Sequence, residues 1–515
     1  MPADVARAQA VSDSRRIGQS THTQILKSTA IIGGASVINV LFAIVRNKAM
    51  AVLLGPQGVG LMGLYSSIAD LTQTLAALGI QDSGVRQIAE AAGTGDGQRI
   101  ARTATALKWV SVVLGLLGAL ALAAASFPIA AFTFGDSQHA VGVMLLSAAV
   151  FFRLVTAGQI ALVQGMRRIS DLARITMLGA LFSTVISIPM VFFLGADGIV
   201  PSLVAMAAVS VLTSWWYSRK IQVSETSLSA RQVGQETAAL LRLGIVFMAS
   251  AFLTVGAAYA IRIIVLRADG IEAAGLYQAA WALGGLYVGF ILQAMGADFY
   301  PRLTAIANDN VECNRLVNEQ AQVSMLLAGP GVIATLTLAP LVISLFYTPE
   351  FNPAVNLLRW ICLGMMLRIV AWPMGFIVLA KGARQIFFWT EVAATVVHVG
   401  LAWLLVPRFG VIAAGAAFFG LYVWHSVLIY FIVRRLSGFR WSVANLKLGM
   451  LFLPACGIVF AAFFFLSYWQ ATLLGAVIVL CSGLYSLRTL FILLPAEAMP
   501  APLRRWLAPA LRVTS

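Results

Sequence analysis

The sequence predicts an all-α polytopic membrane protein, and its composition and its long apolar segments support this fold class. Of its 515 residues, 60% are hydrophobic and only 11% are charged, whereas soluble domains carry about 25% charged residues. The apolar segments reach the roughly 20 residues that a spanning helix needs, and they lack the alternation of a membrane β-barrel. The net charge of +15 is spread over short loops rather than gathered on one basic face, which excludes a nucleic-acid-binding protein.

The apolar segments predict about 14 transmembrane helices. The windows are residues 28–53, 60–82, 105–127, 141–164, 172–194, 199–217, 240–266, 273–298, 322–347, 355–380, 386–406, 411–433, 446–468 and 471–494. The first window is too long for a signal peptide, so we interpret it as a retained spanning helix. The four cysteines have no zinc-ligand spacing, and neither a catalytic constellation, a metal site nor a cofactor is expected.

The basic residues predict the orientation of these helices. Most of the 35 lysines and arginines fall near the two ends of the chain or in the turns after even-numbered windows. Short loops rich in lysine and arginine stay on the cytoplasmic side. We therefore expect a multi-pass protein of the bacterial inner membrane with both termini cytoplasmic.

Short sequence matches indicate an internal duplication. The matching pairs are GLY at 63–65 and 275–277, GMRRI at 165–169 and GARQI at 382–386, GIV at 198–200 and GVI at 410–412, and the basic pairs 219–220 and 434–435. Their common order indicates two parallel six-helix halves, as in many transporters. The predicted domains are a cytoplasmic arm at 1–24, a lobe at 25–220, a cytoplasmic linker at 221–239, a second lobe at 240–435, an extra helix pair at 436–495 and a basic cytoplasmic tail at 496–515.

Charged residues inside the apolar windows suggest the function. The cations are Arg46, Lys48, Arg153, Arg262, Arg359 and Arg368, and the acids are Asp70, Asp298 and Glu391. An arginine at the centre of a helix costs about 2.5–3.5 kcal/mol in lipid, so these side chains should face protein or water. The excess of cations predicts an anionic cargo, because arginine donates paired hydrogen bonds to phosphate. The candidate substrate contacts are Arg46, Lys48, Arg153, Arg262 and Arg368.

Several of these cations have a structural alternative. Arg46, Lys48 and Arg262 lie near helix ends and could extend to water along their aliphatic stems, and Arg359 is expected to do so. The two deepest arginines, in windows four and ten, could instead form ion pairs with acids in the membrane.

The acids and histidines in the windows also keep two interpretations. Asp70 is either a counter-ion to an arginine or a proton site, and Asp298 and Glu391 are either coupling residues or ordinary interface residues. His398 and His425 could titrate near neutral pH, or they could be hydrogen-bonded core residues. The candidates for coupling or counter-ion roles are therefore Asp70, Asp298, Glu391 and His398.

A family resemblance follows from pieces that occur in order along the chain. They include NKAMAVLLGPQGVGL at 47–61, LGIQDSGVRQIAE at 78–90, YAIRIIVLRA at 259–268, DFYPRLT at 298–304 and AKGARQIFFWTEV at 380–392. The chain resembles O-antigen translocases of the Wzx type, which are lipid-linked oligosaccharide flippases of the polysaccharide transporter family in the MOP superfamily. The resemblance implies two six-helix lobes around a cationic central cavity. Lys48, Arg262 and Arg368 match basic positions of that pattern, whereas Arg153 matches none.

The expected function is flipping of an undecaprenyl-diphosphate-linked oligosaccharide, an O-antigen or related lipopolysaccharide precursor, from the cytoplasmic to the periplasmic leaflet. The expected partners are this substrate, membrane lipids and the polysaccharide polymerase machinery. One alternative is a multidrug exporter of the same architecture, which the buried positive charge disfavours. Another is a membrane-embedded glycosyltransferase, which the short outer loops disfavour.

Overall fold

The computed structural model describes residues 2–221, 230–295 and 299–493, of which 2–37 and positions 230, 246, 290, 293, 294 and 301 are described by backbone alone. The described ranges consist of helices joined by turns and loops, and they contain no strand. Ten helices in the described part of the chain are long and apolar enough to cross a membrane, or eleven if one bent pair counts as a span. The prediction of an all-α polytopic membrane protein is confirmed.

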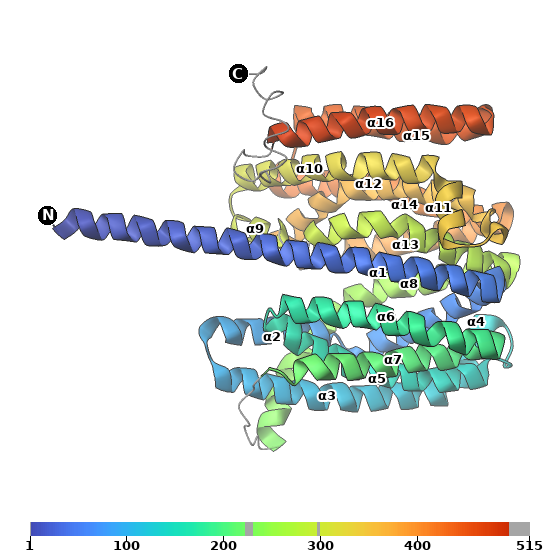
Figure 1. The fold of residues 1–515 in the computed structure, drawn as a ribbon, viewed down its shortest axis with the longest axis horizontal. Coiled ribbons are helices and arrows are strands. Elements are labelled where there is room, and N and C mark those ends of the chain that lie inside the picture. Colours follow the sequence, from blue (N-terminus) through green and yellow to red (C-terminus); the bar gives the residue numbers. More distant parts are fainter. Residues whose placement is uncertain (1, 222–229, 296–298, 494–515) are drawn as a thin grey trace. The chain divides into compact units, whose positions relative to one another are not determined.

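The helices follow one another with short connections (Figure 1). The first part of the chain holds α1 (Pro2–Ala77), α2 (Ile80–Thr94), α3 (Gly97–Ala124), α4 (Ser126–Phe134), α5 (Ala140–Gly165), α6 (Ile169–Leu194), η1 (Gly195–Gly198), α7 (Ile199–Ser218) and α8 (Ala230–Ala294). The second part holds α9 (Tyr300–Ala305), α10 (Asn310–Thr337), α11 (Ala339–Phe346), η3 (Pro349–Phe351), α12 (Ala354–Ala380), α13 (Arg384–Phe409), α14 (Ile412–Ser437), α15 (Val443–Phe465) and α16 (Tyr468–Leu493).

Three of the apolar stretches are too long for a single crossing. They span 38–77, 169–218 and 247–289, with 40, 50 and 43 residues. At 1.5 Å per residue, each exceeds the roughly 30 Å of the hydrocarbon core by about a factor of two. Each is also broken once, at Gly55 in α1, at η1 and at Gly270 in α8. The count of fourteen crossings stays a prediction. The three breaks favour it, because each of them divides one long stretch into two crossings.

Glycine is required where α1 and α8 break. Gly55 has φ 61° and ψ −171°, and Gly270 has φ 85° and ψ −178°. Only glycine adopts this region readily, because a Cβ atom would clash with the neighbouring backbone. Both helices therefore turn at a residue that the sequence could not exchange freely.

The internal duplication is visible in the backbone. The helix series α3, α4, α5, α6 and α7 is matched in order by α10, α11, α12, α13 and α14. Residues with positive φ recur 215 positions apart, as the pairs Gly55 and Gly270, Arg167 and Gly382, and Gly195 and Gly410. Arg153 and Arg368 have the same spacing.

This constant spacing supports the predicted repeat and corrects part of its register. The match between GMRRI and GARQI, at a spacing of 217, is displaced by two positions from the structural register. At this place the two halves share a turn with positive φ, which Arg167 adopts in the first half and Gly382 in the second.

The described residues form two compact units. One unit ends at Leu266 and also includes Leu345–Thr348, and the other holds the remaining residues. The division thus falls inside α8, outside the predicted linker at 221–239. Residues 222–229 of this linker lie beyond the described residues, and 230–239 form the start of α8. The predicted domain boundaries at 25–220 and 240–435 remain a prediction.

In the first unit, α3, α5 and α7 pack side by side, and α6 packs on α1 (Figure 1). Its core includes Tyr65, Leu146 and Leu154. The N-terminal part of α8 belongs here, because Gly244 meets the backbone at Gly79 too closely for a Cβ on either residue. Thr133 and Tyr259 add a hydroxyl hydrogen bond of 2.5 Å between α4 and α8.

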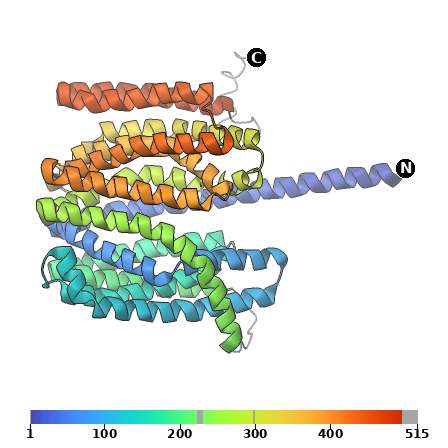
Figure 2. The same ribbon diagram turned by 180° about the vertical axis from the view of Figure 1, so that it is seen from behind.

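In the second unit, α12 packs against both α14 and α10. Its core includes Phe299, Ile377 and Phe439. The extra pair predicted at 436–495 corresponds to α15 and α16, which lie side by side in both views and pack on α10 (Figure 2). The pair therefore belongs to the body of this unit.

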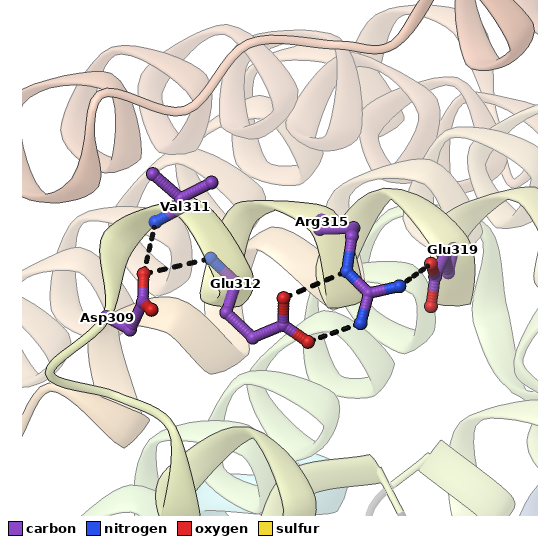
Figure 3. A network of polar contacts seen from close by, with 5 residues as sticks. All are labelled: Asp309, Val311, Glu312, Arg315 and Glu319. Carbon is purple, nitrogen blue, oxygen red and sulfur yellow. Dashed lines mark hydrogen bonds and ion pairs between the residues drawn. The ribbon is translucent and has the colours of Figure 1, made fainter.

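Helix α10 shows why a spanning helix begins well before its apolar window. Asp309 caps it by accepting hydrogen bonds from the Val311 and Glu312 amides at 2.9 and 3.1 Å (Figure 3). Arg315 then pairs with Glu312 and with Glu319, the latter at 2.8 Å. A carboxylate cap and ion pairs one turn apart stabilise a polar first turn, so α10 begins at Asn310, twelve residues before the predicted window.

Other boundaries differ from the prediction as well. Helix α1 already begins at Pro2, so it includes the predicted arm at 1–24, whose cytoplasmic location stays a prediction. Helices α2 and α4 were not predicted. Helix α2 is amphipathic, with Ile80, Ile88 and Ala91 buried, and α4 is too short to register as a span. The predicted tail at 496–515 lies outside the described residues.

Candidate functional site

The arginine in the fourth predicted window has a direct partner. Arg153 on α5 donates from Nη1 to Asp70 Oδ1 on α1 at 2.5 Å. The side chains are 25% and 54% exposed, so the pair is accessible rather than sealed in the core. The structure thus shows the ion pair that the sequence left open, with Asp70 as the counter-ion.

Two other candidate cations of the first unit, Lys48 and Arg262, contact main-chain oxygens. Lys48 donates from Nζ to the carbonyl oxygen of Tyr347 at 2.5 Å, and Arg46 lies near the same tyrosine. Arg262 donates from Nη1 to the carbonyl of Ala258, one turn earlier in α8, at 3.2 Å. The structure therefore brings Arg46 and Lys48 together at Tyr347.

The arginine in the tenth predicted window lies in different surroundings. The guanidinium carbon of Arg368 on α12 stands 4.7 Å from the ring centroid of Trp372 and 5.9 Å from that of Tyr422. Such distances allow cation–π attraction. Arg368 also interacts electrostatically with Glu391 and His398. It forms no ion pair with a carboxylate within the described ranges.

Several polar atoms around Arg368 are buried without a hydrogen-bond partner. They are Nε of Arg368, Nε2 of His398 and Nδ1 of His425. His398 on α13 is 8% exposed. An unsatisfied buried polar group costs about 1–3 kcal/mol, and three of them in one cluster indicate a site prepared for a ligand or a proton. Sequence reasoning expected His398 to be either hydrogen-bonded or titratable, and Nε2 shows no hydrogen bond.

Aromatic rings line this cluster. Phe418 on α14 lies 5.6 Å from His398 and 5.0 Å from Tyr422, between ring centroids. Trp281 on α8 lies 5.1 Å from Phe418. The cluster around Arg368 is thus built by three neighbouring helices, α12, α13 and α14, with α8 behind them. We call it the Arg368 cluster.

The sequence missed part of this cluster. In the sequence, Tyr422, Phe418 and Trp372 carry no signal beyond their aromatic character. The spacing of Arg368 and Trp372, one helical turn apart, was the available signal, because residues four apart share a helix face.

One cation was placed wrongly by sequence reasoning, and one acid is not described. Arg359 was expected to extend to water, but it is 6% exposed. Its guanidinium stacks on Phe463 at 3.5 Å and donates to the carbonyl of Leu336 and to Asn356. These contacts satisfy the charge inside the second unit. Asp298 lies outside the described residues.

Chemically, the Arg368 cluster can hold an anion. Arginine offers a planar fork of donors, and the adjoining histidines can donate or accept protons. The aromatic walls exclude water, which strengthens electrostatic contacts.

Comparison with protein families identifies the chain. Residues 49–356 match the family model described as "Polysaccharide biosynthesis protein". The chain belongs to the polysaccharide biosynthesis protein family. Among the relatives of this family member is the lipid III flippase of Escherichia coli (strain K12), which is 22% identical over 404 residues, or 78% of this chain and 95% of the relative. Another is the amylovoran biosynthesis protein AmsL of Erwinia amylovora, 25% identical over 57% of this chain and 75% of the relative.

Solved structures show which fold this family member has. The inward closed conformation of the lipid II flippase MurJ is similar with a TM-score of 0.64, covering 90% of this chain and 100% of MurJ at 13% identity. An inward-facing multidrug resistance MATE transporter of the MOP superfamily gives 0.60, covering 80% and 99% at 16% identity. The fold is therefore the one that these two transporters share. The similar proteins confirm the expectation of a transporter rather than an enzyme.

Proposed function

We propose that this protein is a flippase that moves an undecaprenyl-diphosphate-linked oligosaccharide from the cytoplasmic to the periplasmic leaflet of the bacterial inner membrane. The observation that carries the proposal is Arg368, a membrane-embedded cation without a carboxylate partner in the described structure and with its Nε atom unsatisfied. A diphosphate supplies the missing charge and acceptors. The name of the similar lipid III flippase supports a lipid-linked cargo.

The oligosaccharide is the part of such a substrate that a bilayer opposes most. Each sugar hydroxyl taken into hydrocarbon without a partner costs several kcal/mol. We propose alternating access through the cationic cavity that the sequence predicts, which keeps the sugars hydrated while the polyprenyl chain remains in lipid.

In this proposal Arg368 is the first diphosphate contact. A net hydrogen bond to a charged group contributes about 1.5–3 kcal/mol, and the stacked Trp372 and Tyr422 rings hold the guanidinium in place. Arg46, Lys48 and Arg262 are further candidates. Lys48 would have to exchange its bond to the Tyr347 carbonyl for a phosphate oxygen.

Arg153 takes part by exchange of its partner. Its contact with Asp70 neutralises it, but both groups are partly exposed. If the pair faces the proposed water-filled cavity, it contributes only about 0.2–1 kcal/mol, so a diphosphate with higher charge can displace Asp70. In this way Asp70 serves as a counter-ion that holds Arg153 until the substrate arrives.

Glu391 and His398 are the candidates for coupling in the second unit, since both lie close enough to Arg368 to sense its charge. Binding of an anion at Arg368 changes the potential at both groups, and either can exchange a proton in response. Asp298 remains a further candidate by sequence alone.

The exporter alternative shares the fold, because MATE transporters of the MOP superfamily are among the similar structures. A cationic drug would be repelled by Arg368, which has no direct ion pair in the described structure, so we favour the flippase. The lipid III flippase among the relatives favours a transporter over the glycosyltransferase alternative.

A genetic experiment tests the proposal. The gene is deleted in its natural host, and the lipid-linked oligosaccharide is labelled in sealed spheroplasts and in lysed cells. We expect the substrate to accumulate at the inner face, protected from external label until lysis. Normal surface polysaccharide together with altered drug tolerance would favour the exporter instead.

A further inference from the structure

A pocket in the first unit is lined by none of the candidate substrate contacts or coupling residues. It is formed by α3, α5 and α7 and has a volume of about 300 Å³. Its walls include Val112, Val155 and Leu162, and its polar lining includes Lys108, Gln159 and Arg219. This volume is at the lower end of the range for small-ligand sites, so it suits a headgroup rather than a whole lipid.

Two cations flank this pocket without a carboxylate partner in the described part of the chain. Lys108 is exposed and forms no ion pair there. The Arg219 guanidinium lies over the rings of Trp215 and Trp216, at 4.5 and 3.8 Å from their centroids. Neither contact neutralises the positive charge, so the pocket attracts an anion.

The pocket is also lined by a side chain that can donate hydrogen bonds, that of Gln159. The Gln159 side-chain oxygen accepts a hydrogen bond from the Ser214 hydroxyl. The amide N–H groups of Gln159, which lines the pocket, have no hydrogen-bond acceptor among the described residues. Two cations and an amide donor together fit a phosphodiester, which has negative charge and only acceptor oxygens.

The surroundings of the pocket are apolar and typical of a membrane interface. Trp215 and Trp216 are 48% and 49% exposed, and tryptophan gathers at the level of lipid headgroups. Further along α3, Val113, Leu116 and Leu120 are also exposed. An acyl chain can lie along this face while its headgroup enters the pocket.

We propose that this pocket binds an anionic glycerophospholipid, with its phosphodiester between Lys108 and Arg219. Basic pockets between membrane helices are known to select such headgroups. The positive-inside pattern of the sequence would place this lipid in the inner leaflet. The inference does not rest on the proposed flippase function.

Native mass spectrometry of the purified full chain tests the proposal. The protein is presented with phosphatidylglycerol or with phosphatidylethanolamine, and the double variant Lys108→Gln/Arg219→Gln is measured alongside. We expect retention of phosphatidylglycerol over phosphatidylethanolamine, and about a thirtyfold weaker retention in the variant, since each basic residue near an anionic headgroup contributes roughly a factor of five.

Two further variants test whether retention depends on where the charge lies and on the space inside the pocket. Arg434→Gln/Arg435→Gln removes the same charge from the exposed end of α14 and should leave retention unchanged. Ala104→Trp fills the pocket without changing the charge and should abolish retention.

Equal retention by the wild type and the Lys108→Gln/Arg219→Gln variant would overturn the proposal. Competition by inorganic phosphate at equal concentration would show a phosphate site rather than a lipid site. Preferential retention of undecaprenyl diphosphate would assign the pocket to the transported lipid, and the proposed occupant would then be wrong.

Discussion

Arg153 on α5 and Arg368 on α12 occupy corresponding positions of the two repeated halves, yet only Arg153 contacts a carboxylate, that of Asp70 at 2.5 Å. At the repeat spacing of 215 residues, the position that corresponds to Asp70 is Gly285. Glycine cannot neutralise an arginine. The duplication has therefore diverged around this arginine, and the second unit keeps a cation free to bind an anion.

The divergence extends to the histidines. The positions that correspond to His398 and His425 in the first half are Ser183 and Ser210. The second half thus has two ionisable rings that the first half lacks at the corresponding positions, and the first half has an acid where the second has glycine. This asymmetry assigns the units different tasks in the proposed transport cycle.

Replacement of Arg368 tests the main substrate contact. We expect Arg368→Ala to reduce flipping about 10- to 100-fold, because a charged hydrogen bond contributes about 1.5–3 kcal/mol. Arg368→Lys should retain part of the activity through its charge. Flipping is measured in reconstituted vesicles, with Arg434→Ala as a matched loss of an exposed arginine. Full activity of Arg368→Ala with normal membrane insertion would refute the assignment.

Replacement of Asp70 tests the exchange of partners at Arg153. Asp70→Asn removes the competing carboxylate, so the affinity for a polyprenyl diphosphate should rise by up to about fivefold, the value of an exposed ion pair. Arg153→Ala/Asp70→Asn should bind no more tightly than Arg153→Ala. The measurement is a binding titration with the purified protein. An unchanged affinity in Asp70→Asn would remove Arg153 from the site.

His398→Phe separates stability from function in the Arg368 cluster. Phenylalanine fits beside Phe418 and removes the unsatisfied Nε2 atom, so the midpoint of thermal unfolding should stay equal or rise. Flipping should nevertheless fall at least about tenfold if this ring exchanges a proton during transport, as one lost charged interaction would cause.

A matched control for this variant is Val396→Phe, which adds an aromatic ring at an exposed position of α13. It should leave both stability and transport unchanged. Wild-type transport by His398→Phe would show that the histidine has no functional part.

The glycine breaks can be tested by stability alone. Gly55→Ala and Gly270→Ala should each lower the free energy of unfolding by about 1–3 kcal/mol, because alanine is strained at these backbone angles. Gly179→Ala is the control, since it lies in α6 with open space around a new Cβ and should stabilise by about 0.5–1 kcal/mol. Thermal unfolding in detergent measures all three. Equal effects of the three variants would contradict the strain argument.

The membrane fold could be predicted from the sequence because it follows from apolar length, a local property. The duplication was also detectable, since Arg153 and Arg368 retain their FRLV and LRIV contexts at a constant spacing. Helix α2 escaped prediction because its apolar face is short and its other face is polar, and the apolar window of 60–82 ran across the turn at Leu78 and Gly79.

The surroundings of each cation could not be predicted, because they depend on tertiary contacts. Asp70 and Arg153 are 83 residues apart in sequence, and an ion pair was only one of two interpretations. Arg359 resembles a residue near a helix end in sequence, but packing of α15 covers it with Phe463. The Arg368 cluster needed the joint placement of α12, α13 and α14, which no local pattern encodes.

Flipping by the purified protein measures the central claim most directly. Vesicles containing an undecaprenyl-diphosphate oligosaccharide are prepared with the wild type, with Arg368→Ala or without protein, and the fraction of substrate open to an external lectin is followed over time. We predict that the wild type moves protected substrate to the outer surface, whereas Arg368→Ala behaves almost like empty vesicles. Equal protection with and without the wild-type protein would contradict the account.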